Sequence, residues 1–186
     1  MEAISYFTSA IYNSSLLLCP VVIIYWFLKA GCIKQQLRLA IVAANWVMLI
    51  AGTLYGIKWI TETYTAWFSG EEYEQYALLN RMTGPYWWAY WSMLCFSLLI
   101  PQLLWFRKIR NSTIAAFMFP LLLNYGLLFE RFVIVITSLH RDYLPSSWMM
   151  FHPFSVSGVQ MGIYVALTGG AYLVFRRRKE KRVVKY

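Results

Sequence analysis

Long apolar runs separated by short polar segments form the pattern of this chain. Five runs reach the length of about 20 residues at which an α-helix crosses a hydrocarbon core. They cover residues 10–30, 37–68, 86–106, 113–139 and 153–175. The pattern predicts an all-α membrane protein with a single domain over residues 1–186, built as a four-helix bundle plus one flanking helix. The second and fourth runs are longer than a span requires, so we expect these helices to tilt or to extend beyond the bilayer.

Three prolines fall near the middles of the first, third and fourth runs, at Pro20, Pro101 and Pro120. Proline lacks a backbone N–H and clashes with the carbonyl four residues earlier, so we expect these helices to be interrupted or kinked. Polar residues within the runs are expected to form hydrogen bonds between helices. These residues are Asn13, Asn45 and Gln102.

The composition supports a membrane location. Hydrophobic residues make up 60% of the chain and charged residues only 13%, far from the balance of a soluble domain. The three cysteines, Cys19, Cys32 and Cys95, have no paired spacing, so they predict neither a disulfide framework nor a metal site.

Basic residues are concentrated in alternate connecting segments, which is the main orientation signal in a membrane protein. They lie in the first segment, in the third segment and in the tail: Lys29, Lys34, Arg38, Arg107, Lys108, Arg110 and the stretch "RRRKEKRVVKY". The second connecting segment, "SGEEYEQYALLNRM", is an acidic loop. This distribution predicts a multi-pass protein of the bacterial inner membrane, with a periplasmic N-terminus and a cytoplasmic C-terminus. The net charge of +9 therefore indicates topology rather than a nucleic-acid partner.

Four charged residues lie within the predicted spans, where ionised groups are costly and often functional. Lys58 and Glu62 are four residues apart in the second run, and Glu130 and Arg131 are adjacent in the fourth. The triplet "HRD", His140 to Asp142, follows on the same predicted side of the membrane. We expect these residues to form one polar cluster at the outer side, with His140 and Asp142 at its aqueous mouth.

Two interpretations of this cluster remain open. The pairs sum to zero charge, so they could form a neutral network that only fixes helix register. Alternatively, the cluster moves protons or binds a ligand, because burial of a carboxyl group favours its protonated form and makes it a proton carrier. A histidine at the rim could exchange that proton with water.

The stretch "GPYWWAYW", residues 84–91, begins the third run with a cluster of aromatic rings. It is typical of an interfacial aromatic belt, and contact of Trp87 and Trp88 with a ring-shaped ligand is the second interpretation. The chain has only two histidines, His140 and His152, and neither lies within a span. An intramembrane haem with two histidine ligands is therefore not expected.

Several motifs resemble one family. The stretches "ITETYTAWFSGEEYEQY", "NRMTGPYWWAYW", "PQLLWFRKIR" and "LFERFVIVITSLHRDYLPSSW" are similar to the NrfD-like membrane subunits of bacterial alternative complex III, of the ActC type. The resemblance extends from about residue 49 to residue 154. It matches the C-terminal half of a subunit that has about ten spans, and Lys58 stands where an uncharged residue is expected.

The resemblance implies a haem-free subunit of a quinol:electron-acceptor oxidoreductase, which oxidises quinol, usually menaquinol, and has been proposed to conduct protons. It also implies periplasmic iron–sulfur and multihaem cytochrome subunits as partners, together with a second NrfD-like half. Carried over by position, it assigns Glu62, Glu130, Arg131, His140, Arg141 and Asp142 to the family's polar motifs.

The sequence thus predicts an integral membrane subunit of a quinol-oxidising respiratory complex, unlikely to be a complete enzyme alone. Glu62, Glu130, Arg131, His140 and Asp142 are the candidates for a proton path. Weaker candidates for contact with quinol are Lys58, Arg141, Trp87 and Trp88. The alternative is a structural or assembly subunit with no redox or proton role of its own, while a transporter formed by dimerisation has little support beyond the predicted kinks.

Overall fold

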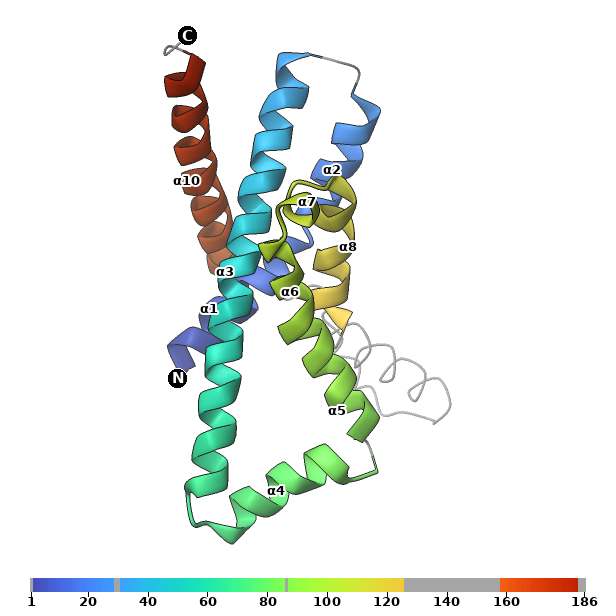
Figure 1. The fold of residues 1–186 in the computed structure, drawn as a ribbon, viewed down its shortest axis with the longest axis vertical. Helices are drawn as coiled ribbons and strands as arrows, with labels where there is room; N and C mark the ends of the chain where they lie inside the picture. The colour runs from blue at the N-terminus through green and yellow to red at the C-terminus, as the bar shows by residue number, and fades with distance from the viewer. Residues whose placement is uncertain (1, 29–30, 86, 126–157, 184–186) are drawn as a thin grey trace.

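The computed structural model describes residues 2–28, 31–85, 87–125 and 158–183 of the chain. Every regular element in these ranges is helical (Figure 1), as the sequence predicted. The helices are α1 (Glu2–Ser15), α2 (Leu18–Phe27), α3 (Cys32–Phe68), α4 (Glu72–Thr83), α5 (Trp87–Leu94), α6 (Ile100–Gln102), α7 (Arg107–Arg110), α8 (Thr113–Leu123) and α10 (Gly158–Val183). A π-helical segment, η1 (Cys95–Leu99), and a 3-10 segment, η2 (Leu103–Trp105), lie on either side of α6.

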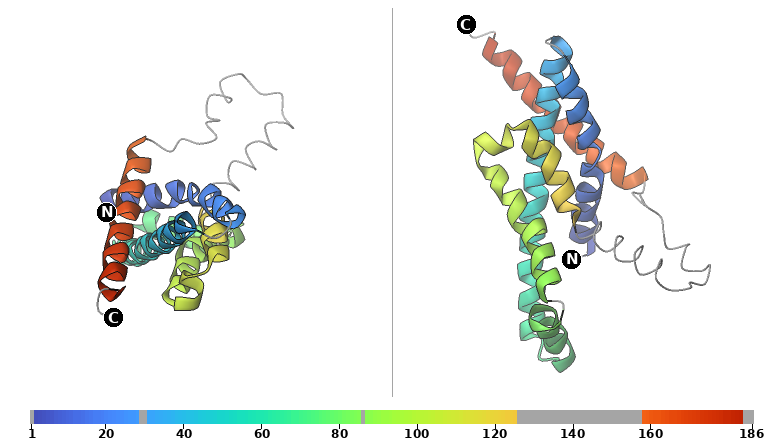
Figure 2. Two further views of the ribbon diagram at one scale, coloured as in Figure 1. Left: turned by 90° about the horizontal axis from the view of Figure 1, so that it is seen from above. Right: turned by 90° about the vertical axis from the view of Figure 1, so that its right-hand side faces the viewer.

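Helix α3 is the central element of the fold. It has 37 residues, which corresponds to a length of about 55 Å at 1.5 Å per residue. Seen from above, α10 lies on one side of α3 and the segment α5 to α8 on the other (Figure 2). The core gathers around the middle of α3, where Ile41, Met48 and Leu49 are buried together with small residues such as Ala44 and Ala51.

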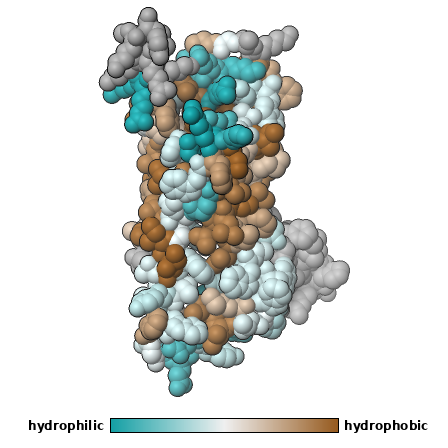
Figure 3. Space-filling view, in the orientation of Figure 1, coloured by the Kyte–Doolittle hydropathy of each residue, from teal (hydrophilic) through white to brown (hydrophobic). Residues whose placement is uncertain are grey.

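Within the described residues, four helical stretches are long and apolar enough to cross a membrane: Ala3–Phe27, Cys32–Phe68, Trp87–Trp105 and Gly158–Arg178. Apolar side chains form a band across the middle of the molecule, with polar groups at both ends (Figure 3). The predicted runs 37–68 and 86–106 correspond closely to two of these helices. Of the predicted run 113–139, the structure describes α8, which ends at Leu123, and residues 126–139 lie outside the described ranges.

The helical stretch that contains the first predicted span, residues 10–30, begins earlier in the chain. The apolar helical stretch starts at Ala3 rather than at residue 10, and the helix ends at Phe27 because Leu28 is extended. Polar residues near the N-terminus do not prevent helix formation. The Thr8 hydroxyl donates to the carbonyl oxygens of Ile4 and Ser5, so a hydroxyl is satisfied within the helix itself.

The expected interruption at Pro20 is confirmed. Helix α1 ends at Ser15 and α2 begins at Leu18, so the break includes Leu16, whose carbonyl lies four residues before the proline. The Leu16 oxygen accepts instead from the backbone N–H of Cys19, at 3.1 Å. The break therefore follows from the missing donor and the ring clash of proline.

Pro101 has a similar effect in the third span, where regular α-helix gives way to η1, α6 and η2. Proline leaves the Ser97 carbonyl without its usual donor four residues later. The hydroxyl of Tyr12 on α1 donates to this oxygen at 2.9 Å. An irregular stretch of one helix is thus satisfied by a side chain from another.

Two buried asparagines link helices. The Asn45 amide donates to the Arg110 carbonyl at 2.7 Å, which confirms the prediction that Asn45 bridges helices. The Asn124 amide donates to the Tyr12 carbonyl at 2.7 Å and so joins the end of α8 to α1. Gln102 bonds locally, where its oxygen accepts from the Trp105 indole at 2.9 Å.

The acidic segment after α3 is not a loop, as the sequence reading assumed, but the helix α4. Its first turn carries Glu72 and Glu74, and its last turn carries Arg81. These charges complement the helix dipole at both ends. Helix α4 lies at the end of the molecule opposite the α2–α3 connection and the C-terminal end of α10 (Figure 1).

Candidate functional site

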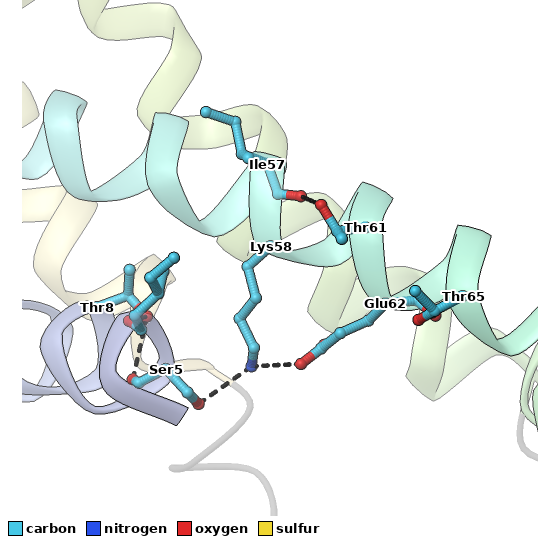
Figure 4. Close-up of polar contacts among 8 residues, drawn as sticks. Ser5, Thr8, Ile57, Lys58, Thr61, Glu62 and Thr65 are labelled. Carbon is cyan, nitrogen blue, oxygen red and sulfur yellow. Dashed lines mark hydrogen bonds and ion pairs between the residues drawn. The ribbon is translucent and has the colours of Figure 1, made fainter. Parts of the chain in front are cut away.

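Lys58 on α3 is the centre of a small polar network with Ser5 and Glu62 (Figure 4), here called the Lys58 network. Its Nζ lies 3.4 Å from Oε1 of Glu62 and donates to Oγ of Ser5 at 3.0 Å. The ion pair is possible because residues four apart lie on the same face of a helix. Ser5 belongs to α1, so the network also joins two helices.

The two charged groups of the network differ in their surroundings. The Lys58 side chain is 16% exposed, whereas that of Glu62 is 50% exposed. A mostly buried ammonium group is costly unless acceptors compensate for its lost hydration. Glu62 and Ser5 supply two acceptors, and the Tyr55 ring lies 6.0 Å from the Lys58 nitrogen. Glu62 therefore stabilises Lys58 and still presents part of its carboxylate outward.

The outward side of Glu62 faces a pocket of about 580 Å³ between α3, α4 and α5, here called the α4 pocket. This volume is within the range of small-molecule sites. Four aromatic residues contribute to its wall, and the indole of Trp59 donates to the Tyr90 hydroxyl at 3.1 Å. The lining residues are Tyr55, Trp59, Glu62, Thr63, Thr65, Ala66, Tyr73, Glu74, Ala77, Leu78, Arg81 and Tyr90.

The α4 pocket combines aromatic surfaces with charged groups. Two carboxylates, Glu62 and Glu74, and the guanidinium of Arg81 line the same cavity. Aromatic walls suit a planar ring, and a carboxylate at hydrogen-bond distance can accept a proton from a hydroxyl group. The arrangement can therefore bind a hydroxylated ring and receive its proton.

The predicted site residues fall into three groups. Lys58 and Glu62 are brought together as the spacing predicted. Trp87 and Trp88 on α5 are 54% and 46% exposed and are absent from the lining of the α4 pocket, so their contact with a ligand stays a prediction. The remaining candidates, Glu130, Arg131, His140, Arg141 and Asp142, lie outside the described residues.

Sequence reasoning missed several contributors to this region. Ser5 is 53 residues from Lys58, and nothing in the local pattern connects them. Glu74 and Arg81 belong to the segment that was read as a loop, although acidic residues before an apolar stretch and an arginine after it are a helix signal. Among the described residues, no three His, Cys, Asp or Glu side chains gather as a metal site would require.

Comparison with known proteins gives no assignment: neither a protein-family model nor a curated protein matches this chain.

Proposed function

We propose that this chain is an integral membrane subunit of a quinol-oxidising respiratory complex in the bacterial inner membrane. Four helices with the length and apolarity of membrane spans support this placement. The resemblance of four sequence motifs to NrfD-like subunits supports the assignment to such a complex. The chain crosses the membrane five times, with residues 113–139 as the fourth span and with a four-helix bundle plus one flanking helix. Its N-terminus is periplasmic and its C-terminus is cytoplasmic.

The distribution of charge along α3 supports this orientation. Lys34 and Arg38 lie near the start of α3, and the acidic helix α4 follows its end. Basic residues remain on the cytoplasmic side of bacterial membrane proteins. From Arg38, about 20 helical residues span the hydrocarbon core, which places Lys58 at the outer boundary of the membrane. Glu62 and the α4 pocket then lie at the periplasmic interface.

The observation that carries the proposal is the double contact of Glu62, which is paired with Lys58 and also lines the α4 pocket. Oxidation of a quinol to a quinone releases two electrons and two protons. The aromatic wall holds the quinol ring. The Glu62 carboxylate accepts the protons of the two ring hydroxyls one after the other and passes each to the periplasm before it accepts the next. Lys58 stabilises the ionised carboxylate between turnovers.

The electrons leave to redox subunits outside the membrane, because the chain carries no haem of its own in this proposal. The family resemblance implies periplasmic iron–sulfur and multihaem cytochrome subunits for this role, and a second NrfD-like half completes the membrane part. The chain is therefore one component of an oxidoreductase rather than an enzyme by itself. Glu130, Arg131, His140 and Asp142 extend the proton path, and Arg141 contributes to the quinol site.

One observation favours the structural alternative. The pair Lys58–Glu62 is neutral in sum, and its bond to Ser5 fastens α3 to α1. A subunit that only supports assembly could use such a network to fix the register of its helices. A substitution of Glu62 that lowers quinol turnover and leaves the stability of the protein unchanged would favour the quinol-oxidising function over the structural one.

The first test is to purify the tagged full-length chain from its own membranes in a mild detergent and to identify the co-purifying proteins by mass spectrometry. Iron–sulfur and multihaem subunits are expected, and the preparation should reduce an electron acceptor with a soluble menaquinol analogue as donor. A lone chain or a homodimer without quinol oxidation would contradict the proposal.

A further inference from the structure

A second cavity lies far along α3 from the α4 pocket, between α2, the first turns of α3, and α10, and is here called the α10 groove. Its volume is about 460 Å³. Leu18 and Val21 form one wall, Leu37 and Ala40 the second, and Tyr164 and Gly169 are part of the third. Almost all of this surface is apolar, so the groove suits a hydrocarbon chain.

Glycine keeps the α10 groove open. Gly169 lines the groove, and no described atom lies within 4 Å of the position that a Cβ atom would occupy there. The next residue, Gly170, is also free of contacts at its Cβ position but does not line the groove. A larger side chain at Gly169 would therefore fill the cavity without striking the described backbone.

Basic residues stand beside the lining residues at one end of the groove. On α3, Lys34 follows Ile33, which lines the groove. On α10, Arg176 lies one helical turn after the lining residue Tyr172. Arg176 is exposed. An apolar cavity whose end is flanked by cations is complementary to a molecule with an acyl chain and a negative headgroup.

Lys34 and Arg176 each have a partner within the chain. Lys34 donates to the Leu28 carbonyl at 3.0 Å and lies 5.3 Å from the Tyr25 ring centroid. Arg176 donates to Glu180 at 3.0 Å. An ammonium has three donors and a guanidinium five, so both retain donors for a phosphate group.

The deep wall of the groove contains two hydroxyl groups, those of Tyr164 and Thr168. They lie one helical turn apart on α10, close enough to interact with each other. Neither oxygen forms a hydrogen bond of normal length and angle with a described residue. Buried hydroxyls without a partner are unusual. An ester oxygen of a bound lipid would supply an acceptor for such a hydroxyl.

We propose that the α10 groove binds one anionic phospholipid of the cytoplasmic leaflet. An acyl chain occupies the cavity between α2, α3 and α10, and the phosphate lies between Lys34 and Arg176. The proposal goes beyond quinol oxidation and rests only on the membrane orientation proposed above. The charge of the rim is the reason to choose an anionic lipid over a neutral one.

The test uses the purified full-length chain, stripped of lipid and offered phosphatidylglycerol or phosphatidylcholine with identical acyl chains, with native mass spectrometry as the readout. One retained phosphatidylglycerol per chain is expected, with about tenfold weaker retention of phosphatidylcholine. Gly169→Leu should abolish retention of both lipids, whereas the matched control Gly170→Leu should behave as wild type. Thermal unfolding of both variants checks that each is folded.

A second pair of variants tests the rim and leaves the cavity intact. Arg176→Gln should reduce the preference for phosphatidylglycerol by about fivefold, because one basic residue near a membrane surface contributes roughly that factor. Arg177→Gln removes the same charge one residue away and should leave the preference unchanged. The lipid-retention measurement needs neither quinol nor partner subunits. A negative result would therefore reject lipid binding without bearing on quinol oxidation.

Three outcomes would overturn the proposal. Equal retention of the two lipids by the wild-type chain would show that the basic residues beside the groove do not select an anionic headgroup. Equal lipid retention by Gly169→Leu and Gly170→Leu would show that the lipid does not bind in the groove. Co-isolation of a second polypeptide that is lost in Gly169→Leu would assign the groove to a helix of a partner instead.

Discussion

Gly52 on α3 lies directly against the ring of Pro101 on α6, so that a Cβ atom on Gly52 would overlap the proline Cβ. One turn further, a Cβ on Gly56 would stand 2.9 Å from a methyl carbon of Leu98. Glycines four residues apart allow the close approach of membrane helices. The pair therefore fixes the distance between the central helix and the third span.

Replacing Gly52 by alanine should force α3 and α6 apart. Overpacking of this kind costs about 1–3 kcal/mol, and the Pro101 ring, which is closed onto the backbone, cannot move aside as a flexible side chain would. The measurement is the free energy of unfolding of the purified chain in detergent. Gly170→Ala is the control, because it makes the same change within a helix but has no described atom near its Cβ position. Equal stability of the two variants would show that α3 and α6 do not require this contact.

The hydroxyl of Tyr12 should stabilise the irregular part of the third span through its bond to the Ser97 carbonyl. Tyr12→Phe removes only this hydroxyl and is expected to cost about 0.6–1.7 kcal/mol, the range for hydrogen bonds between membrane helices. Tyr6→Phe, at an exposed tyrosine of the same helix, should have little effect. Unfolding of both variants in detergent gives the comparison.

Pro101 supplies a second check on the same bond. In a Pro101→Ala background, the alanine N–H can return to the Ser97 carbonyl. Loss of the Tyr12 hydroxyl should then cost less than it does in the wild-type chain. A double-mutant cycle measures this coupling. Additive effects would mean that the freed carbonyl is not the reason for the Tyr12 contact.

The sequence predicted the long helices well because their apolar runs are continuous. The described part of the third span, Trp87–Trp105, lies within the predicted bounds 86–106, and the breaks at Pro20 and Pro101 follow directly from proline chemistry. The N-terminal boundary failed because residues such as Thr8 appear polar in a sequence yet are buried and bond to their own helix. Composition alone does not show that such a hydroxyl forms a hydrogen bond within its own helix.

The candidate site was predictable only where its residues are close in sequence. The spacing of Lys58 and Glu62 indicated an ion pair, and the structure confirms it. The contacts to Ser5 and between Trp59 and Tyr90 join different helices, and no local periodicity encodes them. The spacing of Gly52 and Gly56 was a readable signal for helix packing that the sequence analysis did not use.

The proposed orientation predicts which parts of α3 and α4 a membrane-impermeant reagent can reach from outside the cell. Cys32 is exposed at the start of α3 and lies on the proposed cytoplasmic side. In a chain with Cys19 and Cys95 replaced by alanine, Cys32 should react with a membrane-impermeant maleimide only after permeabilisation. A cysteine introduced by Glu72→Cys, with Cys32 also replaced, should react in intact cells. The reverse labelling pattern would invert the topology and move the α4 pocket to the cytoplasm.

Glu62 should be needed for turnover rather than for assembly. General acid–base groups contribute about 10²-fold or more to rates, so Glu62→Gln is expected to reduce quinol-dependent turnover by about that factor in an assembled complex. Glu72→Gln is the matched control, because Glu72 is exposed and does not line the α4 pocket. Turnover and subunit content are measured on the same purified preparation.

Replacing Lys58 and Glu62 together distinguishes a proton path from a structural network. A neutral pair exchanged for apolar residues of similar size is often tolerated, whereas removal of one partner leaves an uncompensated buried charge. Lys58→Met with Glu62→Met should therefore unfold at nearly the wild-type temperature, and Glu62→Met alone should be less stable. If Glu62 carries protons, the double variant remains as inactive as the single one. Recovery of quinol oxidation in the double variant would instead show that the pair only holds α3 against α1, and it would favour the assembly role.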